Sequence, residues 1–244
     1  MRPFFITGIG TDVGKTLVAA ILAEALGADY WKPVQAGYAE GTDSEWVRGV
    51  LGDGRDPQEV EGRVHPEVYK LAMAASPHIA ARVEGRVISL AEIEESYKLI
   101  VASCKPANHI IEGHLQLGAA DSLQPQRPLI IEGAGGLLVP LNEKEFVLDL
   151  AAKLGAPLIL VSRNYLGSIN HSLLTAAVCK AHGLRVAGWI FNDQYLHYEQ
   201  EIVQWSGIPG IASIPATERP DAAWIREQAE RIRPLAQRLV RSVY

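Results

Sequence analysis

The stretch FFITGIGTDVGKTLVAAILAEAL, residues 4–26, joins an apolar run, a glycine-rich turn and the pattern of an amphipathic helix. Glycine lets a backbone approach a ligand in conformations that a side chain forbids, and this turn contains Gly8, Gly10 and Gly14. A helix that begins at about Lys15 directs its unpaired N–H groups and the positive end of its dipole toward the turn. The pattern therefore predicts a phosphate-binding loop.

The end of the turn indicates which phosphate compound binds. A lysine there suits terminal phosphates, and the hydroxyl of Thr16 suits Mg²⁺. The loop is one residue longer than the general motif G-x-x-x-x-G-K-[ST], because the five residues 9–13 separate Gly8 from Gly14. An ordinary strand-to-helix turn is the alternative. The apolar strand before the turn and the helix after it favour a nucleoside triphosphate site.

Composition excludes several classes of protein. The 244 residues are 48% hydrophobic and 21% charged, which is ordinary for a globular protein. A net charge of -5 argues against general nucleic-acid binding. Cys104 and Cys179 lie far apart in apolar surroundings and predict buried thiols in a reducing compartment. With neither a signal-peptide pattern nor an apolar stretch long enough to span a bilayer, we expect a cytoplasmic protein.

Apolar strand patterns alternate with helical ones along the chain. Expected strands cover residues 2–8, 28–34, 127–133, 156–162 and 185–192, and expected helices cover 16–26, 90–104, 146–154 and 168–182. This alternation predicts an α/β fold, with a doubly wound, mostly parallel sheet and helices on both faces. Residues 108–127 read as a loop or small insertion, and a single domain over 1–244 is expected. Ligands of such folds bind beyond the carboxyl ends of the strands.

The segment 222–244 is an amphipathic helix pattern with arginines on its polar face. Such a helix can lie on a membrane surface. We expect instead a terminal helix packed on the sheet, and Pro234 would kink it.

Three oxygen-bearing residues predict a site for a hard cation. Glu132 stands at the end of an apolar strand before Gly-Ala-Gly-Gly, where a carboxylate is costly unless it meets a cation. Asp43 follows a glycine-rich turn at an expected helix start, where it either caps the helix or binds Mg²⁺. With Thr16, these two residues form the candidate Mg²⁺ site.

Further candidates lie at other strand and helix ends. Lys32 ends the second expected strand and, if that strand neighbours the first, its ammonium faces the phosphate loop. Ser168 and Asn170 begin a helix that suits a substrate carboxylate, or Ser168 only caps it. Asn192 follows a strand, and its amide matches the edge of adenine, although it could equally be a turn residue.

Together these segments resemble dethiobiotin synthetase over nearly the whole chain. The resemblance rests on TGIGTDVGKT, KPVQAG, SPHIAA, IIEGAGGLLVPL, LGSINHSLLT, FND and SIPAT, in the order in which they occur. The lengthened phosphate loop is itself a mark of that family.

The resemblance implies a homodimeric P-loop enzyme that joins CO₂ and diaminopelargonate into the ring of dethiobiotin with ATP and Mg²⁺. A substrate carbamate would attack the γ-phosphate, and the second amine would then displace phosphate from the mixed anhydride. Lys15, Lys32 and Thr11 would be catalytic, and Lys32, Ala36, Ser168, Ile169 and Asn170 would bind substrate, the last three from the partner subunit. ATP would contact Asp12, Val13, Gly14, Lys15, Thr16, Leu17, Asp43, Glu132, Gly133, Ala134, Gly135, Asn192, Asp193, Ile214, Pro215 and Ala216.

The chain departs from the family pattern at two positions. Ala36 stands where many members have Ser or Thr, so a hydroxyl contact to substrate is lost or replaced by a backbone group or by Gln35. Gly10 stands where some members have an acidic residue, which leaves Asp12 as the carboxylate of the loop. The stretch 108–127 is also longer than the family leads us to expect.

Two other functions are compatible with a P-loop. An amide-forming ligase like cobyrinic acid a,c-diamide synthase usually adds a glutaminase domain, and neither cysteine here has a nucleophile turn. A partition-type switch ATPase has a second lysine early in its loop, where this chain has TGIG. The arginine-rich terminal segment is the one feature that favours the switch.

Overall fold

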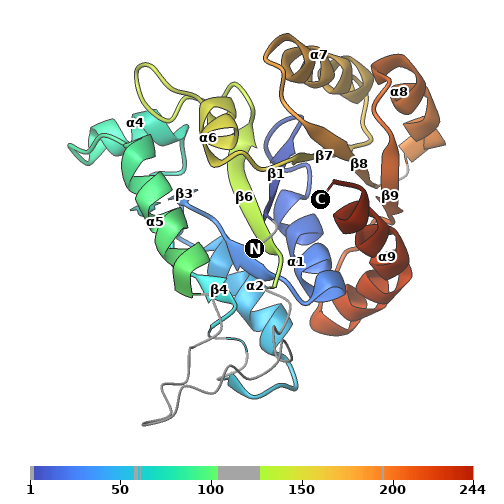
Figure 1. Cartoon of the computed structure of the whole chain (residues 1–244), viewed down its shortest axis with the longest axis horizontal. Coiled ribbons are helices and arrows are strands. Elements are labelled where there is room, and N and C mark those ends of the chain that lie inside the picture. Colours follow the sequence, from blue (N-terminus) through green and yellow to red (C-terminus); the bar gives the residue numbers. More distant parts are fainter. Residues whose placement is uncertain (1–2, 58–59, 61, 104–126, 194, 244) are drawn as a thin grey trace, which may run out of the picture.

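The computed structural model describes residues 3–57, 60, 62–103, 127–193 and 195–243. Over these residues, seven strands form a parallel sheet in the order β4-β2-β6-β1-β7-β8-β9 (Figure 1). They are β1 (Pro3–Gly8), β2 (Asp29–Trp31), β4 (Val64–His65), β6 (Leu129–Gly136), β7 (Leu158–Arg163), β8 (Val186–Asn192) and β9 (Gly210–Ile214). The predicted doubly wound α/β fold is confirmed.

The central strand β1 shows why helices cover both faces of the sheet. Phe4 and Ile6 belong to one buried cluster and Phe5 to the other, because successive side chains point to opposite faces. The face of Phe4 is covered by α1 (Lys15–Leu26), α2 (Asp43–Gly52) and α9 (Ala222–Val243). The face of Phe5 is covered by α4 (Pro77–Val83), α5 (Leu90–Ser103), α6 (Val147–Leu154), α7 (Ser168–Ala181) and α8 (Glu199–Ser206).

The expected strand over residues 28–34 is two strands in two sheets. β2 ends at Trp31, and the chain then continues as β3 (Val34–Ala36), which pairs with β5 (Tyr69–Leu71) in a separate two-stranded sheet. Pro33 lies at the break, where it has no N–H to offer a ladder and its carbonyl accepts from Val68 and Tyr69. The prediction of one continuous strand was wrong.

The position of β2 decides the condition attached to Lys32, that its strand neighbours the first strand. β2 does not neighbour β1, because β6 lies between them and pairs with both. Glu132 is also not the last residue of its strand, since β6 continues to Gly136 opposite Gly8. The small residues that follow Glu132 let β6 run alongside the start of the phosphate loop.

The C-terminal helix packs against the body of the protein. α9 lies on α1 (Figure 1) and buries Ile225, Ala229, Ile232 and Ala236, which agrees with the expected packed helix. Pro234 lies inside this helix, which continues past it to Val243. Among the described residues, no helix is both long and apolar enough to cross a membrane.

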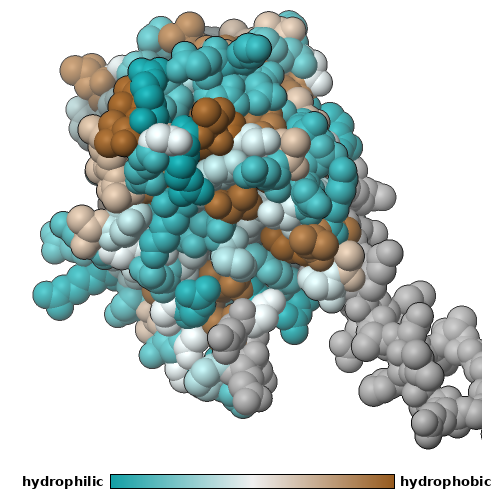
Figure 2. Space-filling model, turned by 90° about the vertical axis from the view of Figure 1, so that its left-hand side faces the viewer, coloured by the Kyte–Doolittle hydropathy of each residue, from teal (hydrophilic) through white to brown (hydrophobic). Residues whose placement is uncertain are grey.

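The cysteine that the structure describes is buried, and the surface around α4 and α5 is mostly hydrophilic (Figure 2). Cys179 is buried, as expected, whereas Cys104 and residues 108–126 lie outside the described residues. Figure 2 shows the face that carries α4 and α5, where hydrophilic residues predominate and hydrophobic ones are scattered in small groups. Exposed apolar residues include Val83, Val87 and Leu99.

Candidate functional site

The phosphate loop has the geometry that its glycines predict. Gly14 is the N-cap of α1 with a φ of 87°, no side chain caps the helix, and its first turn has no acidic residue. A Cβ at Gly14 would lie 2.1 Å from Nδ2 of Asn192, whose amide donates to the Val13 carbonyl at 3.2 Å. The backbone N–H groups of the helix start are therefore available to an anion.

Lys15 is folded back over the loop. Its Nζ donates to the Gly10 carbonyl at 2.9 Å, and the side chain is buried. Burial lowers the pKa of Lys15, while the negative charge of Glu132 opposes that effect. The Gly10 carbonyl is a neutral acceptor, and a triphosphate would offer this buried ammonium an anionic acceptor, which forms the stronger hydrogen bond.

Glu132 is the centre of a buried hydrogen-bond network. Its Oε1 accepts from Thr16 Oγ1 at 2.8 Å and from Lys32 Nζ at 3.0 Å. Its Oε2 accepts from the Tyr30 hydroxyl at 2.8 Å. Lys32 also forms an ion pair with Asp43, so one ammonium joins both predicted carboxylates.

The charge states of this network follow from burial and from its neighbours. Burial by itself lowers the pKa of Lys32, but Glu132 and Asp43 outweigh it and the pKa is raised. Lys32 therefore remains an ammonium. Burial, followed by the charge of Glu132, raises the pKa of Tyr30 well above its usual value, so the phenol remains a hydrogen-bond donor.

Asp43 lies at the start of α2, where Thr42 forms the cap. The Thr42 hydroxyl accepts from the Glu45 N–H, and Glu45 in turn accepts from the Thr42 N–H. The capping role therefore belongs to Thr42, which leaves the carboxylate of Asp43 free of that role. Gln35 accepts from the Asp43 N–H at 3.3 Å and so links β3 to this helix start.

The residues present fit Mg²⁺. Thr16, Asp43 and Glu132 offer only oxygen ligands, and Mg²⁺ in phosphoryl-transfer sites takes one or two carboxylates together with phosphate oxygens. Both carboxylates already form ion pairs with one cation, the ammonium of Lys32. No cluster of three or more His, Cys, Asp or Glu side chains suited to a metal occurs among the described residues.

A cavity of about 820 Å³ gathers all three predicted catalytic residues, Thr11, Lys15 and Lys32. The predicted residues that line it are Thr11, Asp12, Gly14, Lys15, Thr16, Lys32, Ala36, Asp43, Glu132, Ala134 and Gly135. Gln35, the alternative substrate contact beside Ala36, also lines it. The sequence patterns assigned no role to the other residues that line this cavity, which are Val34, Ala74, Ala75, Ser76, Pro77 and Val139. The segment SPHIAA, which carried part of the resemblance, supplies two of these, Ser76 and Pro77.

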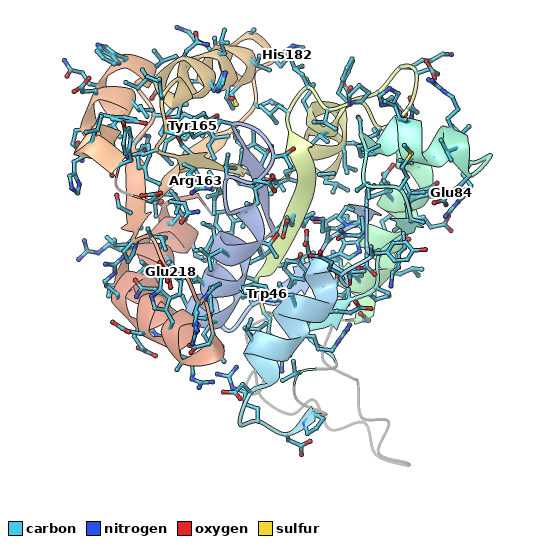
Figure 3. The ribbon with its side chains drawn as sticks, turned by 180° about the vertical axis from the view of Figure 1, so that it is seen from behind. Trp46, Glu84, Arg163, Tyr165, His182 and Glu218 are labelled. Carbon is cyan, nitrogen blue, oxygen red and sulfur yellow. The ribbon has the colours of Figure 1, made fainter. Side chains whose placement is uncertain are left out.

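A neighbouring cavity of about 340 Å³ begins at the same helix start. It is lined by the predicted residues Thr16, Leu17, Asp43, Asn192, Asp193 and Ala216, and also by Trp46, Arg163, Thr217 and Pro220. Trp46 comes from α2 and Arg163 from β7 (Figure 3). The arrangement gives a nucleotide two adjoining spaces, one beside Lys32 and one beside Asn192.

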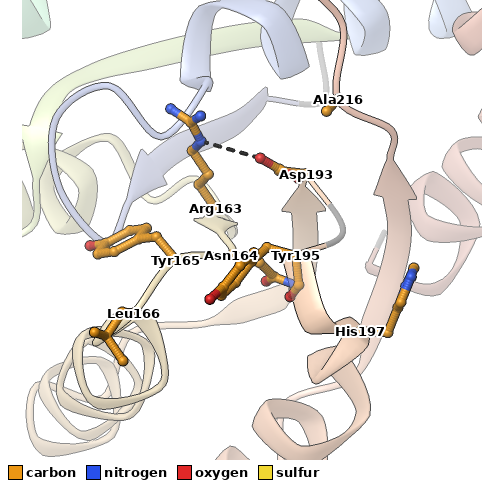
Figure 4. Close-up of a pocket in the computed structure, with 8 residues that line it drawn as sticks. All are labelled: Arg163, Asn164, Tyr165, Leu166, Asp193, Tyr195, His197 and Ala216. Atoms are coloured by element: carbon orange, nitrogen blue, oxygen red, sulfur yellow. Dashed lines mark hydrogen bonds and ion pairs between the residues drawn. The ribbon is translucent and has the colours of Figure 1, made fainter.

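A third hollow, of about 560 Å³, adjoins the second cavity at Arg163, Asp193 and Ala216 (Figure 4). Arg163 and Asp193 form an ion pair of 3.7 Å there. Tyr195 and His197 form part of its wall. No local pattern singles out Arg163, because a charged residue at a strand end is ordinary.

Some predicted residues lie outside these cavities. Val13 and Ile214 are buried, while Gly133 packs against the Phe5 ring and leaves no room for a Cβ. Ser168 begins α7 but is fully buried, and its hydroxyl contacts the Tyr198 hydroxyl at 2.6 Å. Gly167 is the N-cap of α7, with no side-chain cap, so Ser168 is not the cap. Pro215, Ile169 and Asn170 line none of the three cavities.

Tyr30 contacts Glu132, and the sequence pattern did not indicate this contact. An aromatic residue in an expected strand is a typical core residue, and its ring is indeed fully buried. Its hydroxyl reaches Glu132 only because β2 pairs with β6.

A glycine-rich loop between a parallel strand and a helix, with a lysine and a threonine at the helix start and two carboxylates nearby, defines a P-loop nucleotide-binding protein. Residues 2–223 match the family described as an AAA domain. The cell-division protein MinD of Aquifex aeolicus has the same fold, with a TM-score of 0.55, 16% identity and coverage of 98% of this chain and 97% of that chain. A ParA family ATPase of Chlorobium tepidum gives a TM-score of 0.51 at 15% identity, over 97% and 92% of the two chains.

Sequence relatives define the family more closely. The ATP-dependent dethiobiotin synthetase of Cytophaga hutchinsonii is 48% identical over 83% of this chain and 82% of the relative. That of Rhodopseudomonas palustris is 37% identical over 91% and 89%, and that of Christiangramia forsetii is 36% identical over 95% and 96%. The chain belongs to the dethiobiotin synthetase family of ATP-dependent ligases, as its motifs indicated.

Proposed function

We propose that this chain closes the ureido ring of dethiobiotin from diaminopelargonate and CO₂, with conversion of ATP to ADP and phosphate, as a step of biotin biosynthesis. The observation that carries the proposal is the linked series Asp43–Lys32–Glu132–Thr16 beside the phosphate loop, in which Lys32 and Glu132 are buried. The names and the coverage of the sequence relatives support the choice of substrate. We infer one domain over residues 1–244.

The proposed reaction proceeds in three steps. One amine of the substrate adds to CO₂ and loses a proton, which gives a carbamate. A carbamate oxygen attacks the γ-phosphorus of ATP, and ADP leaves, so a carbamic–phosphoric anhydride forms. The second amine attacks the carbamoyl carbon, phosphate leaves, and the ring closes with loss of one more proton.

Two lysines neutralise the charge that these steps bring together. Carbamate and γ-phosphate are both anionic, so their approach requires fixed cations, and electrostatic stabilisation is the main contribution to phosphoryl transfer. Lys32 lies between the carboxylates at the wall of the larger cavity and Lys15 lies in the phosphate loop. Thr11 assists from the same loop, and Ala36 borders the substrate with Gln35 beside it.

Thr16, Asp43 and Glu132 would hold Mg²⁺, which supplies charge neutralisation for the β- and γ-phosphates when bound. Asn192 and Asp193 would contact adenine, and the Ile214–Pro215–Ala216 stretch would border the base. The side-chain amide of Asn192 also donates one N–H to the Val13 carbonyl, so its oxygen and its second N–H are left for a ligand.

We further infer a homodimer in which the start of α7 grips the substrate carboxylate of the partner subunit. The uncapped N-terminus of α7 suits an anion. The Ser168 hydroxyl is already bonded to Tyr198 and its backbone N–H donates to the Tyr165 carbonyl. The backbone N–H groups of the next residues and the exposed side chain of Asn170 are what this segment offers. The reaction would take place in the cytoplasm, with no nucleic-acid or membrane partner.

The experiment is phosphate release by the purified protein with ATP, Mg²⁺ and bicarbonate, with and without diaminopelargonate, and mass detection of the product. Phosphate release that depends on the diamine, with a matching amount of dethiobiotin, is expected. Hydrolysis that ignores the diamine, or no hydrolysis with it, would overturn the proposed substrate. Co-sedimentation with liposomes in the presence of ATP would instead favour a switch ATPase.

A further inference from the structure

Tyr30 reaches Glu132 from a neighbouring strand. The backbone register places Tyr30 opposite Ile130, and Glu132 lies two residues further along β6 on the same face. The Tyr30 ring packs in the core cluster that also contains Ile130. Its hydroxyl extends diagonally to Glu132 Oε2, 2.8 Å away. The Tyr30 ring therefore packs in the core, while its hydroxyl donates to the Glu132 carboxylate.

The two oxygens of Glu132 are held by different donors. Oε1 accepts from Thr16 and from Lys32, which both line the larger cavity. Oε2 accepts from Tyr30, which does not line that cavity. The terminal torsion of a glutamate is broad and easily rotated, so a donor on Oε2 is what fixes the direction in which Oε1 points.

We propose that Tyr30 is a positioning residue, whose hydroxyl orients the Glu132 carboxylate toward Thr16 at the place where the Mg²⁺ of the nucleotide would be held. The inference rests on the proposed function. Glu132 is 1% exposed. If the Tyr30 hydroxyl were removed, water would therefore not replace it as the donor to Oε2. Outer hydrogen-bond partners of metal-binding carboxylates affect metal affinity by keeping the ligand oriented.

The test compares Tyr30→Phe with the matched variant Tyr69→Phe. Each removes one oxygen from a buried tyrosine that donates to a glutamate, because Tyr69 donates to Glu92 away from the site. Binding of a fluorescent ATP derivative is measured as Mg²⁺ is titrated, and urea unfolding is measured in parallel. Tyr30→Phe is expected to raise the Mg²⁺ concentration for half-maximal binding by about 10-fold or more, whereas Tyr69→Phe leaves it unchanged.

A double variant separates positioning from general loosening. If Tyr30 acts through Glu132, then Tyr30→Phe adds nothing to the Mg²⁺ dependence of Glu132→Gln. Additive effects, an unchanged Mg²⁺ dependence in Tyr30→Phe, or an equal change in Tyr69→Phe would each overturn the inference. Failure of the wild-type protein to bind the ATP derivative with Mg²⁺ would contradict the proposed function instead.

Discussion

The Thr16 hydroxyl donates to Glu132 Oε1 across 2.8 Å, although the two residues are 116 positions apart in the chain. Thr16 is in the first turn of α1 and Glu132 is in β6, which pairs with the strand that leads into α1. The parallel pairing of β1 and β6 thus brings a hydroxyl and a carboxylate together at the phosphate loop.

Lys32→Ala is expected to reduce diamine-dependent phosphate release by about 100-fold or more, because a fixed cation is lost where negative charge develops. ATP binding is expected to survive, since the phosphate loop and Lys15 remain. Steady-state rates and an ATP titration measure the two effects. Lys98→Ala, at an exposed lysine paired with Glu94, is the control and should match the wild type. Complete loss of ATP binding in Lys32→Ala would assign Lys32 a different role.

Gly14→Ala is expected to abolish ATP binding. The new Cβ would meet the Asn192 amide at 2.1 Å, and the φ of 87° disfavours any side chain. Gly27→Ala is the matched control, because Gly27 has a φ of 59° with nothing near its Cβ position. That control should cost about 1 kcal/mol of unfolding free energy and retain binding. Equal binding by both variants would contradict the predicted contact.

Cys179 is expected to resist alkylation in the folded protein. Burial raises the pKa of its thiol to about 11, so the reactive thiolate is scarce near neutral pH. Peptide mass spectrometry after iodoacetamide treatment, with and without urea, measures the protection. Because the unfolded thiol has the lower pKa, its contribution to stability is present below about pH 9 and is lost as the pH rises toward 11. Rapid labelling of the native protein at pH 8 would refute this prediction.

Ile232→Ala is expected to reduce the free energy of unfolding by about 2–5 kcal/mol, because it opens a cavity in the buried contact between α9 and α1. Ile232 is 2% exposed, whereas Leu235 on the same helix is 41% exposed. Leu235→Ala should therefore cost less than about 1 kcal/mol. Urea denaturation of both variants gives the comparison. Similar losses in the two would indicate that α9 does not pack as a core helix.

The sequence by itself determined the phosphate loop. Strand, turn and helix are contiguous over residues 3–26, so residue order alone specifies the geometry of Gly14, Lys15 and Thr16. The alternation of apolar strands and helices likewise determined the fold class, because a strand buried on both faces carries its signal in its own residues. The family resemblance rested on similarly local motifs.

Tertiary structure decided which distant residues meet. The order of strands places β6 between β1 and β2, so Glu132 meets both Thr16, in the helix that follows β1, and Tyr30 of β2. Tertiary packing also brings the Ser168 hydroxyl, at the start of α7, to the Tyr198 hydroxyl, and no local pattern indicates this hydrogen bond. Such contacts depend on which strands and helices lie side by side. That choice minimises the free energy of the whole chain, and no single segment encodes it.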